Sequence, residues 1–193
     1  MMRKVAALSF AFVLLWSSGS SAIAVHNRFT SELIGDFDIS PGSNLQGAVL
    51  DYAELTAVNL NGANLTGASL VNVGMYGVQL QNGNLSETDM QLAYLGYAYF
   101  QGTDFTNADL RLTSLKRSDV AGANFSGADL RGAYLFQTVS LNSTIGTAYY
   151  DDQTSFEGTG FDPVAAGWNL VPEPSTALLL GLGLAGLAAR RRV

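Results

Sequence analysis

The chain has 193 residues, a formal net charge of −6, one histidine and no cysteine. This composition excludes disulfides and a cysteine nucleophile, and the length suits one domain with short flanking segments. Residues 25–170 contain five basic and fifteen acidic residues, a formal charge of −10. A surface this acidic argues against nucleic acid as a partner, because nucleic acids bind basic surfaces.

Residues 1–24 have the parts of a secretory signal peptide. A basic start at Arg3 and Lys4 is followed by an apolar run and then by small, polar residues. The run is too short and too early for a typical membrane span. Ala22 and Ala24 fit a signal peptidase site, so we predict cleavage after Ala24. An uncleaved membrane anchor is the alternative.

Residues 25–42 carry the only histidine, His26, for which no role is predicted. The same segment offers several large apolar side chains, namely Phe29, Leu33, Ile34, Phe37 and Ile39. A repeat follows it, and the first unit of a repeat array has an exposed edge that must be covered. We therefore predict that residues 25–42 form an N-terminal cap.

Residues 43–137 place a large apolar residue at every fifth position. These positions are Leu45, Leu50, Leu55, Leu60, Leu65, Leu70, Met75, Leu80, Leu85, Met90, Leu95, Phe100, Phe105, Leu110, Leu115, Val120, Phe125, Leu130 and Leu135. Five residues advance a helix by roughly 140°, so the apolar residues would spread over every face. A straight strand fails because five is odd and side chains alternate. The chain must therefore turn once per repeat, which winds it into a coil.

The segments "NGANLTGASL", "QGTDFTNADL" and "AGANFSGADLRGAYL" resemble the A(D/N)LXX units of the pentapeptide-repeat proteins. The resemblance implies an all-β, right-handed quadrilateral β-helix with four pentapeptides per coil and nearly five coils. Residues twenty apart then stack. One such inward column is Leu45, Leu65, Leu85, Phe105 and Phe125.

Two outward columns carry polar side chains in this register. The first contains Asn44, Asn64, Asn84, Asp104 and Asn124, for which we predict a ladder of amide hydrogen bonds. The second contains Asp89, Asp109 and Asp129. Stacked carboxylates repel one another, so solvent, Arg111 and Arg131, or a divalent cation must offset the charge. The cation is the weaker alternative, and no metal site or cofactor is predicted.

Residues 138–170 lose the five-residue register and are rich in aromatic and acidic side chains. "AYYDDQTSFEGTGFDPVAAGW" is similar to the closing segment often found after bacterial pentapeptide repeats. We predict a C-terminal cap in which Phe156, Phe161 and Trp168 cover the last coil. An aromatic ligand pocket is the alternative.

Residues 171–193 contain a Pro-Glu-Pro motif, an apolar run and three final arginines. This arrangement resembles the PEP-CTERM sorting signal of Gram-negative bacteria, which implies processing by an exosortase. The sorting motif comprises Pro172, Glu173, Pro174, Arg190, Arg191 and Arg192. As a helix, residues 177–189 span about 20 Å. We predict a short transmembrane segment there, with the arginines on the cytoplasmic side.

These features predict a non-enzymatic exported protein with no catalytic residues. An exosortase would sort it from an inner-membrane precursor to the cell envelope or extracellular matrix, where it would be a structural or protein-interaction module. Signal peptidase, exosortase and transiently the inner membrane are the predicted partners, together with an unidentified protein or polysaccharide. A DNA-mimicking gyrase-type inhibitor, as some pentapeptide-repeat proteins are, is disfavoured by export. A secreted metal-dependent binding protein is the remaining alternative.

Overall fold

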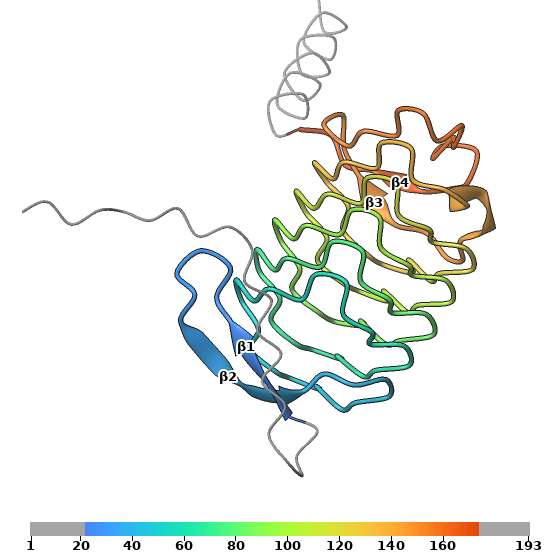
Figure 1. Cartoon of the computed structure of the whole chain (residues 1–193). Helices are drawn as coiled ribbons and strands as arrows, with labels where there is room; N and C mark the ends of the chain where they lie inside the picture. The colour runs from blue at the N-terminus through green and yellow to red at the C-terminus, as the bar shows by residue number, and fades with distance from the viewer. Residues whose placement is uncertain (1–21, 174–193) are drawn as a thin grey trace, which may run out of the picture.

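The computed structural model describes residues 22–173, most of which wind into a stack of coils (Figure 1). Each coil pairs with the next in parallel through residues twenty apart, as in Asn44↔Asn64 and Asn64↔Asn84. The predicted stacking is therefore confirmed, and the chain forms a four-sided pentapeptide β-helix. Each side contributes single bridges instead of a strand, because a chain that turns every five residues leaves few extended residues between corners.

The interior contains the apolar residues that the five-residue period picks out. All nineteen predicted positions are buried, with Leu45 at 4% exposure and the others fully enclosed. The rings of Phe105 and Phe125 stack in parallel with centroids 5.0 Å apart. Some inward positions carry hydroxyl groups, and these donate to backbone carbonyls: Thr103 donates to Leu80 at 2.7 Å. Apart from Ser43 Oγ in the first coil, the buried serine and threonine hydroxyl groups of the described residues are thus partnered, which avoids the cost of burying them alone.

A β-hairpin covers the first coil. Its strands β1 (Ala22–His26) and β2 (Leu33–Asp38) pair in antiparallel. The backbone N–H of Arg28 donates to the carbonyl of Tyr52 at 2.7 Å, and the N–H of Glu54 donates to the carbonyl of His26 at 3.0 Å. These bonds occupy backbone groups at the start of the coil that would otherwise form an unpaired edge.

The other end continues past Gln137 as a less regular layer. Parallel pairing includes Asp119↔Val139 and then Asn124↔Ile145, a spacing of twenty-one residues. The extra residue is accommodated around the short 3₁₀-helix η1 (Leu141–Ser143). Strands β3 (Tyr149–Tyr150) and β4 (Asn169–Leu170) then pair in parallel. The five-residue period ends before the winding does.

Aromatic rings close this end of the coil. The ring of Trp168 lies 6.0 Å from that of Phe125, measured between centroids, and 4.8 Å from that of Phe161. Phe156 packs against the same cluster, with its centroid 5.9 Å from Trp168. These contacts bring the three aromatic residues of the predicted cap over the last regular coil.

No helix within residues 22–173 is long and apolar enough to span a membrane. The apolar run at 177–189 lies outside the described residues, as do Pro174 and the three final arginines.

Candidate functional site

The outward column from Asn44 to Asn124 forms part of what we call the asparagine side: residues 44–47, 64–67, 84–87, 104–107 and 124–127. The predicted ladder has amide hydrogen bonds at two steps. Asn64 Nδ2 donates to Asn44 Oδ1 at 3.3 Å, and Asn124 Nδ2 donates to Asp104 Oδ1 at 3.2 Å.

A second interaction on the asparagine side is more regular and was not predicted from the sequence. The side-chain Oδ1 at each of the five column positions accepts the backbone N–H two residues later, as Asn64 does from Thr66 at 3.1 Å and Asn84 from Ser86 at 2.9 Å. Asx-type bonds of this kind stabilise corners. The column therefore holds the turns of the coil as well as linking its layers.

Arginines pair with two of the three carboxylates of the aspartate column. Arg111 Nη2 lies 2.6 Å from Asp109 Oδ2, and Arg131 Nη2 lies 2.5 Å from Asp129 Oδ2. Arg111 also bridges the layers, with its Nε 3.8 Å from Asp129 Oδ2. Asp89 accepts the side-chain amide of Gln91 at 3.1 Å. The sequence left solvent, arginines or a cation to offset the negative charge of this column. In the structure, Arg111 and Arg131 do so.

These ion pairs shift the pKa of their members. Burial acts to raise the pKa of Asp129, but the hydrogen bonds and positive charge of Arg131 outweigh it and hold that pKa below its ordinary value. The bonds to their carboxylate partners raise the pKa of Arg111 and Arg131. Among residues 22–173, no group of three His, Cys, Asp or Glu side chains is arranged to hold a metal ion.

A third surface, which we call the aromatic side, comprises residues 54–57, 74–77, 94–97, 114–117 and 134–137. Its outward residues include Tyr76, Tyr94, Tyr97, Lys116, Arg117, Tyr134 and Phe136. The aromatic side was not predicted from the sequence. Reading the chain in rows of twenty would have aligned these residues, since Tyr94 and Tyr134 share one column and Tyr97 and Arg117 share another.

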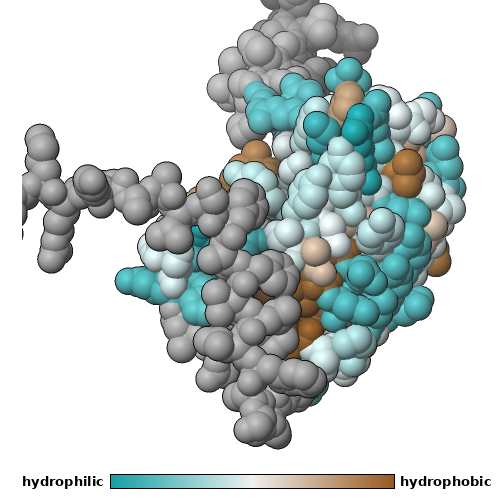
Figure 2. All heavy atoms as spheres, viewed as in Figure 1, coloured by the Kyte–Doolittle hydropathy of each residue, from teal (hydrophilic) through white to brown (hydrophobic). Residues whose placement is uncertain are grey.

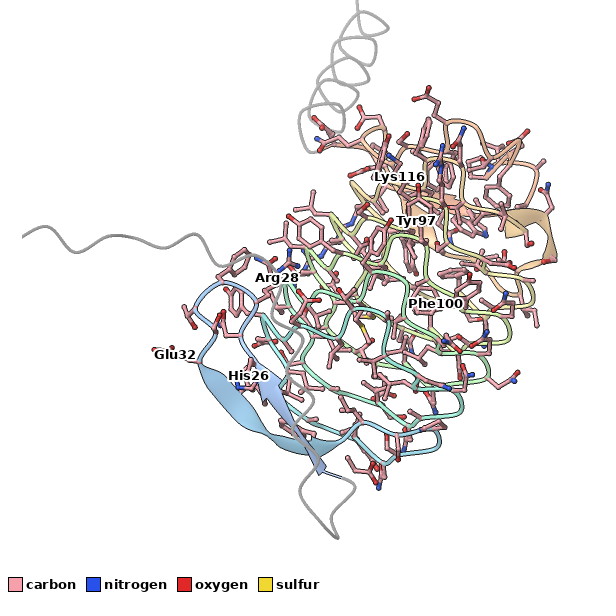
Figure 3. All side chains as sticks on the ribbon, viewed as in Figure 1. His26, Arg28, Glu32, Tyr97, Phe100 and Lys116 are labelled. Atoms are coloured by element: carbon pink, nitrogen blue, oxygen red, sulfur yellow. The ribbon has the colours of Figure 1, made fainter. Side chains whose placement is uncertain are left out.

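Cations lie over the rings of the aromatic side. The guanidinium of Arg28, from the hairpin, is 4.2 Å from the ring centroid of Tyr94. Lys116 Nζ is 5.6 Å from the centroid of Phe136, and the guanidinium of Arg117 is 5.7 Å from that of Tyr97. Figure 3 shows the labelled Arg28, Tyr97 and Lys116 along one flank of the coil, with Phe100 inside it. Figure 2 shows hydrophobic residues only in small groups on the visible surface.

A cavity of about 320 Å³ lies beside the closing aromatic cluster. Phe161, Trp168, Asn142 and Asp162 are among the residues that line it. Asp162 Oδ1 accepts the backbone N–H groups of Val164 and Ala165, so this carboxylate is engaged in its own turn. The rings of Phe161 and Trp168 are nearly buried and meet edge to face, which fits a covering role better than the ligand pocket that the sequence left open.

The sorting segment begins directly after β4 and at first stays on the coil. The N–H of Val171 donates to the carbonyl of Tyr150 at 2.7 Å. Gln153 Nε2 then donates to the Glu173 carboxylate at 2.6 Å, again across twenty residues. Pro172 and Glu173 therefore continue the register of the coil and lie on its last layer.

The predicted cleavage site lies in β1. Ala22 pairs with Asp38 and Ala24 with Asp36, while Val25 and His26 provide the rest of the strand. Cleavage after Ala24 would leave Val25 and His26 on the coil.

Comparison with known proteins agrees with both resemblances. The family model "Pentapeptide repeats (8 copies)" matches residues 42–73, 75–111 and 108–138, and that of the PEP-CTERM protein-sorting motif matches residues 170–192. No curated protein matched the chain.

Solved pentapeptide-repeat structures are also similar. One from the thylakoid lumen of Arabidopsis thaliana is 27% identical, with a TM-score of 0.39 and coverage of 45% of this chain and 63% of that chain. One from Nostoc PCC 7120 is 28% identical, with a TM-score of 0.39 and coverage of 64% and 84%. QnrB1, a plasmid-mediated fluoroquinolone resistance protein, is 18% identical, with a TM-score of 0.38 and coverage of 73% and 72%.

Proposed function

We propose that this chain, a pentapeptide-repeat protein with a C-terminal PEP-CTERM sorting motif, is a non-enzymatic interaction or structural module of the cell envelope or extracellular matrix. The sorting motif points to an exported protein and implies processing by exosortase. This motif at residues 170–192 is the observation that carries the proposal. Its first residues lie on the last layer of the coil, so a cut there would release an intact body.

The proposed route begins with removal of residues 1–24 by signal peptidase. Residues 177–189 would then hold the precursor in the inner membrane of a Gram-negative bacterium, with Arg190, Arg191 and Arg192 on the cytoplasmic side. Exosortase would act at Pro172, Glu173 and Pro174. The released body would be a right-handed β-helix of nearly five coils, capped by residues 25–42 and 138–170.

The surface favours this role over the two alternatives. A DNA mimic needs a continuous anionic surface, whereas Arg28, Lys116 and Arg117 interrupt the negative charge along the aromatic side. A metal-dependent binder needs available carboxylates, whereas Asp109 and Asp129 are bound by arginines. Pentapeptide-repeat proteins are typically non-enzymatic, which supports a role in interaction.

Intact mass spectrometry of the protein from the envelope and culture fluid of its host tests the proposal. We expect a species that begins at Val25 and ends near Pro172. A variant with Pro172, Glu173 and Pro174 all changed to alanine should keep residues 175–193 and accumulate in the membrane fraction. Gln153→Ala is the matched control, because it alters the contact of Glu173 with the body but leaves the motif intact. Most of the protein in the cytoplasm would contradict export.

A further inference from the structure

We propose that the aromatic side binds a linear acidic polysaccharide in which charged and neutral sugars alternate. The inference rests on the proposed function, since it names the partner that an exported module of this kind would meet. It is carried by the rings of the aromatic side, by the cations above them and by the side-chain bond between Arg117 and Tyr97.

The charge of this side is opposite to that of the body. Five basic residues lie within residues 22–173, and two of them, Arg111 and Arg131, pair with aspartates. The other three, Arg28, Lys116 and Arg117, all lie over rings of the aromatic side. The only carboxylate of this side is Glu54 in its first layer, and Glu157 follows in the layer beyond its last, so the four layers between them are free of acid. Such a strip complements a ligand with spaced negative charges.

The rings are exposed, although some of them contact one another. Tyr76 is 52% exposed and Tyr94 is 50% exposed. The centroids of Tyr76 and Tyr97 lie 5.1 Å apart, and those of Tyr134 and Phe136 lie 5.8 Å apart in a stacked pair. Tyrosine offers an apolar face and a hydroxyl group. A pyranose ring presents the matching pair, an apolar C–H face and hydroxyl groups at its rim.

Two side chains of the aromatic side bond to each other at corners with left-handed backbone, a conformation that many corners of the coil share. Tyr97 and Arg117 have φ of 57°, in the left-handed region that disfavours residues with a bulky side chain. Gly77, one layer below Tyr97 at the same corner, has φ of 66° without that penalty. Arg117 Nη1 donates to the hydroxyl of Tyr97 at 2.7 Å, and its Nε donates to Gln137 Oε1 at 2.7 Å. The chain thus forms an ordered polar stack where glycine would relax the corner.

The shape of the surface favours a polymer over a small molecule. The aromatic side repeats once per coil, at about 4.8 Å per layer, which is close to the length of one sugar unit. A chain lying along the coil axis would meet a ring or a cation in successive layers. Because the sugar units are covalently joined, many weak contacts of this kind add up to tighter binding. Lysine and arginine would pair with the carboxylates of its uronate units.

An acidic peptide and a single-stranded nucleic acid are the competing partners. A peptide would need pockets for its side chains, which this row of exposed rings does not supply. A nucleic acid carries a charge on every unit, and the acidic flanks of the aromatic side, with Asp89 and Asp119 on the neighbouring sides, would repel it. A polysaccharide with a charge on every second sugar matches this surface better, because its three cations are spread over several layers.

Isothermal titration of the purified full-length chain in detergent with a hyaluronan decasaccharide tests the proposal. Hyaluronan alternates glucuronate with N-acetylglucosamine, so it serves as a probe of the stated chemistry. We expect saturable binding that weakens as salt is raised. A chito-oligosaccharide of equal length, which lacks the carboxylates, should bind at least tenfold more weakly. Polyglutamate and oligo(dT) should also bind at least tenfold more weakly than hyaluronan, because they supply charge without pyranose faces.

Two variants separate a binding role from a structural one. Tyr97→Gly should weaken hyaluronan binding at least tenfold while leaving the melting temperature unchanged or higher. Leu92→Gly is the matched control, because Leu92 occupies the same kind of corner on a neighbouring side, with φ of 61° and 46% exposure. It should leave binding unchanged. Lys116→Ala combined with Arg117→Ala should reduce both affinity and salt dependence.

Absence of hyaluronan binding by the native chain would overturn the proposal, as would undiminished binding by Tyr97→Gly. Tighter binding of polyglutamate or oligo(dT) would assign the surface to a peptide or a nucleic acid instead. Binding in solution does not depend on where the cell sends the protein. A failure to bind hyaluronan would therefore leave the export proposal standing. A cytoplasmic location of the protein would likewise not alter the result of the binding experiment.

Discussion

The asparagine side and the aromatic side are opposite sides of one coil, and they use their outward residues differently. On the asparagine side, Asn64 and Asn84 accept backbone N–H groups of the following corner. On the aromatic side, Tyr97 and Arg117 bond to each other through their side chains. The interior is equally apolar behind both. One repeat can therefore maintain its fold through one side and leave another available for contacts.

The interior shared by the two sides should give the largest effect. Phe105→Ala would remove a fully buried ring that stacks on Phe125 at 5.0 Å and contacts Phe100 at 5.2 Å. We expect a loss of about 3–5 kcal/mol in the free energy of unfolding, from lost burial and the cavity left behind. Urea denaturation followed by circular dichroism would measure it. A loss below that of an exposed substitution such as Tyr76→Ala would contradict the packing described here.

A substitution on the asparagine side should have the next largest effect. Asn64→Ala would remove the acceptor for the backbone N–H and the hydroxyl of Thr66, and the donor to Asn44. Leaving the partly buried N–H of Thr66 unpaired should cost about 1–2 kcal/mol. Asn64→Asp is the control, because it retains the acceptor oxygen. Equal losses in both variants would show that the corner bond is not what stabilises the coil.

A substitution on the aromatic side should leave the free energy of unfolding unchanged or raise it. Tyr97→Gly would relieve the strain of φ 57°, worth about 1–2 kcal/mol. It would also lose the bond from Arg117 and give the unfolded chain more freedom, at about 0.5–1 kcal/mol. The two nearly cancel, so we expect stability within about 1 kcal/mol of the native chain by urea denaturation. A loss as large as that of Asn64→Ala would mean that both sides maintain the fold.

The same contrast separates what the sequence could predict from what it could not. Leu65 and Phe105 were predicted to be buried because a strict period leaves inward positions no alternative. The contact of Arg28 with Tyr94 could not be predicted, because the hairpin brings together residues far apart in the chain. The winding past Gln137 was also hidden, since one extra residue near η1 breaks the period without ending the coil.

Within the candidate site, the acidic column illustrates the same limit. The sequence shows that Asp109 and Asp129 stack, and it offers arginines, solvent or a cation to offset them. Only side-chain geometry selects among these, because an arginine two residues after its aspartate can extend along the coil or away from it. In the structure Arg111 and Arg131 fold back onto their own aspartates. Patterns set by the backbone were predictable, whereas those set by side-chain torsions were not.

Acid should produce the smallest effect, which we expect from the ion pair of Asp129 in the aspartate column. Asp129 has a pKa below its ordinary value in the folded chain because the bonds to Arg131 outweigh burial. The folded state therefore binds the proton less readily than the unfolded state. The stabilisation is present above the unfolded pKa of about 4 and is lost as the pH falls through the lower folded value. The pair is partly exposed, so solvent screening limits the change to less than about 1 kcal/mol.

Urea denaturation at pH 6 and at pH 3 would measure this loss, and Asp129→Asn supplies the comparison, because its amide does not titrate in this range. The pH dependence of the native chain should exceed that of Asp129→Asn by the contribution of this one ion pair. Tyr97→Gly should keep the full dependence, since Tyr97 lies on another side of the coil. If Asp129→Asn retained the whole dependence, the acid response would have to arise elsewhere in the acidic body, and the ion pair would be a surface contact without measurable effect on stability.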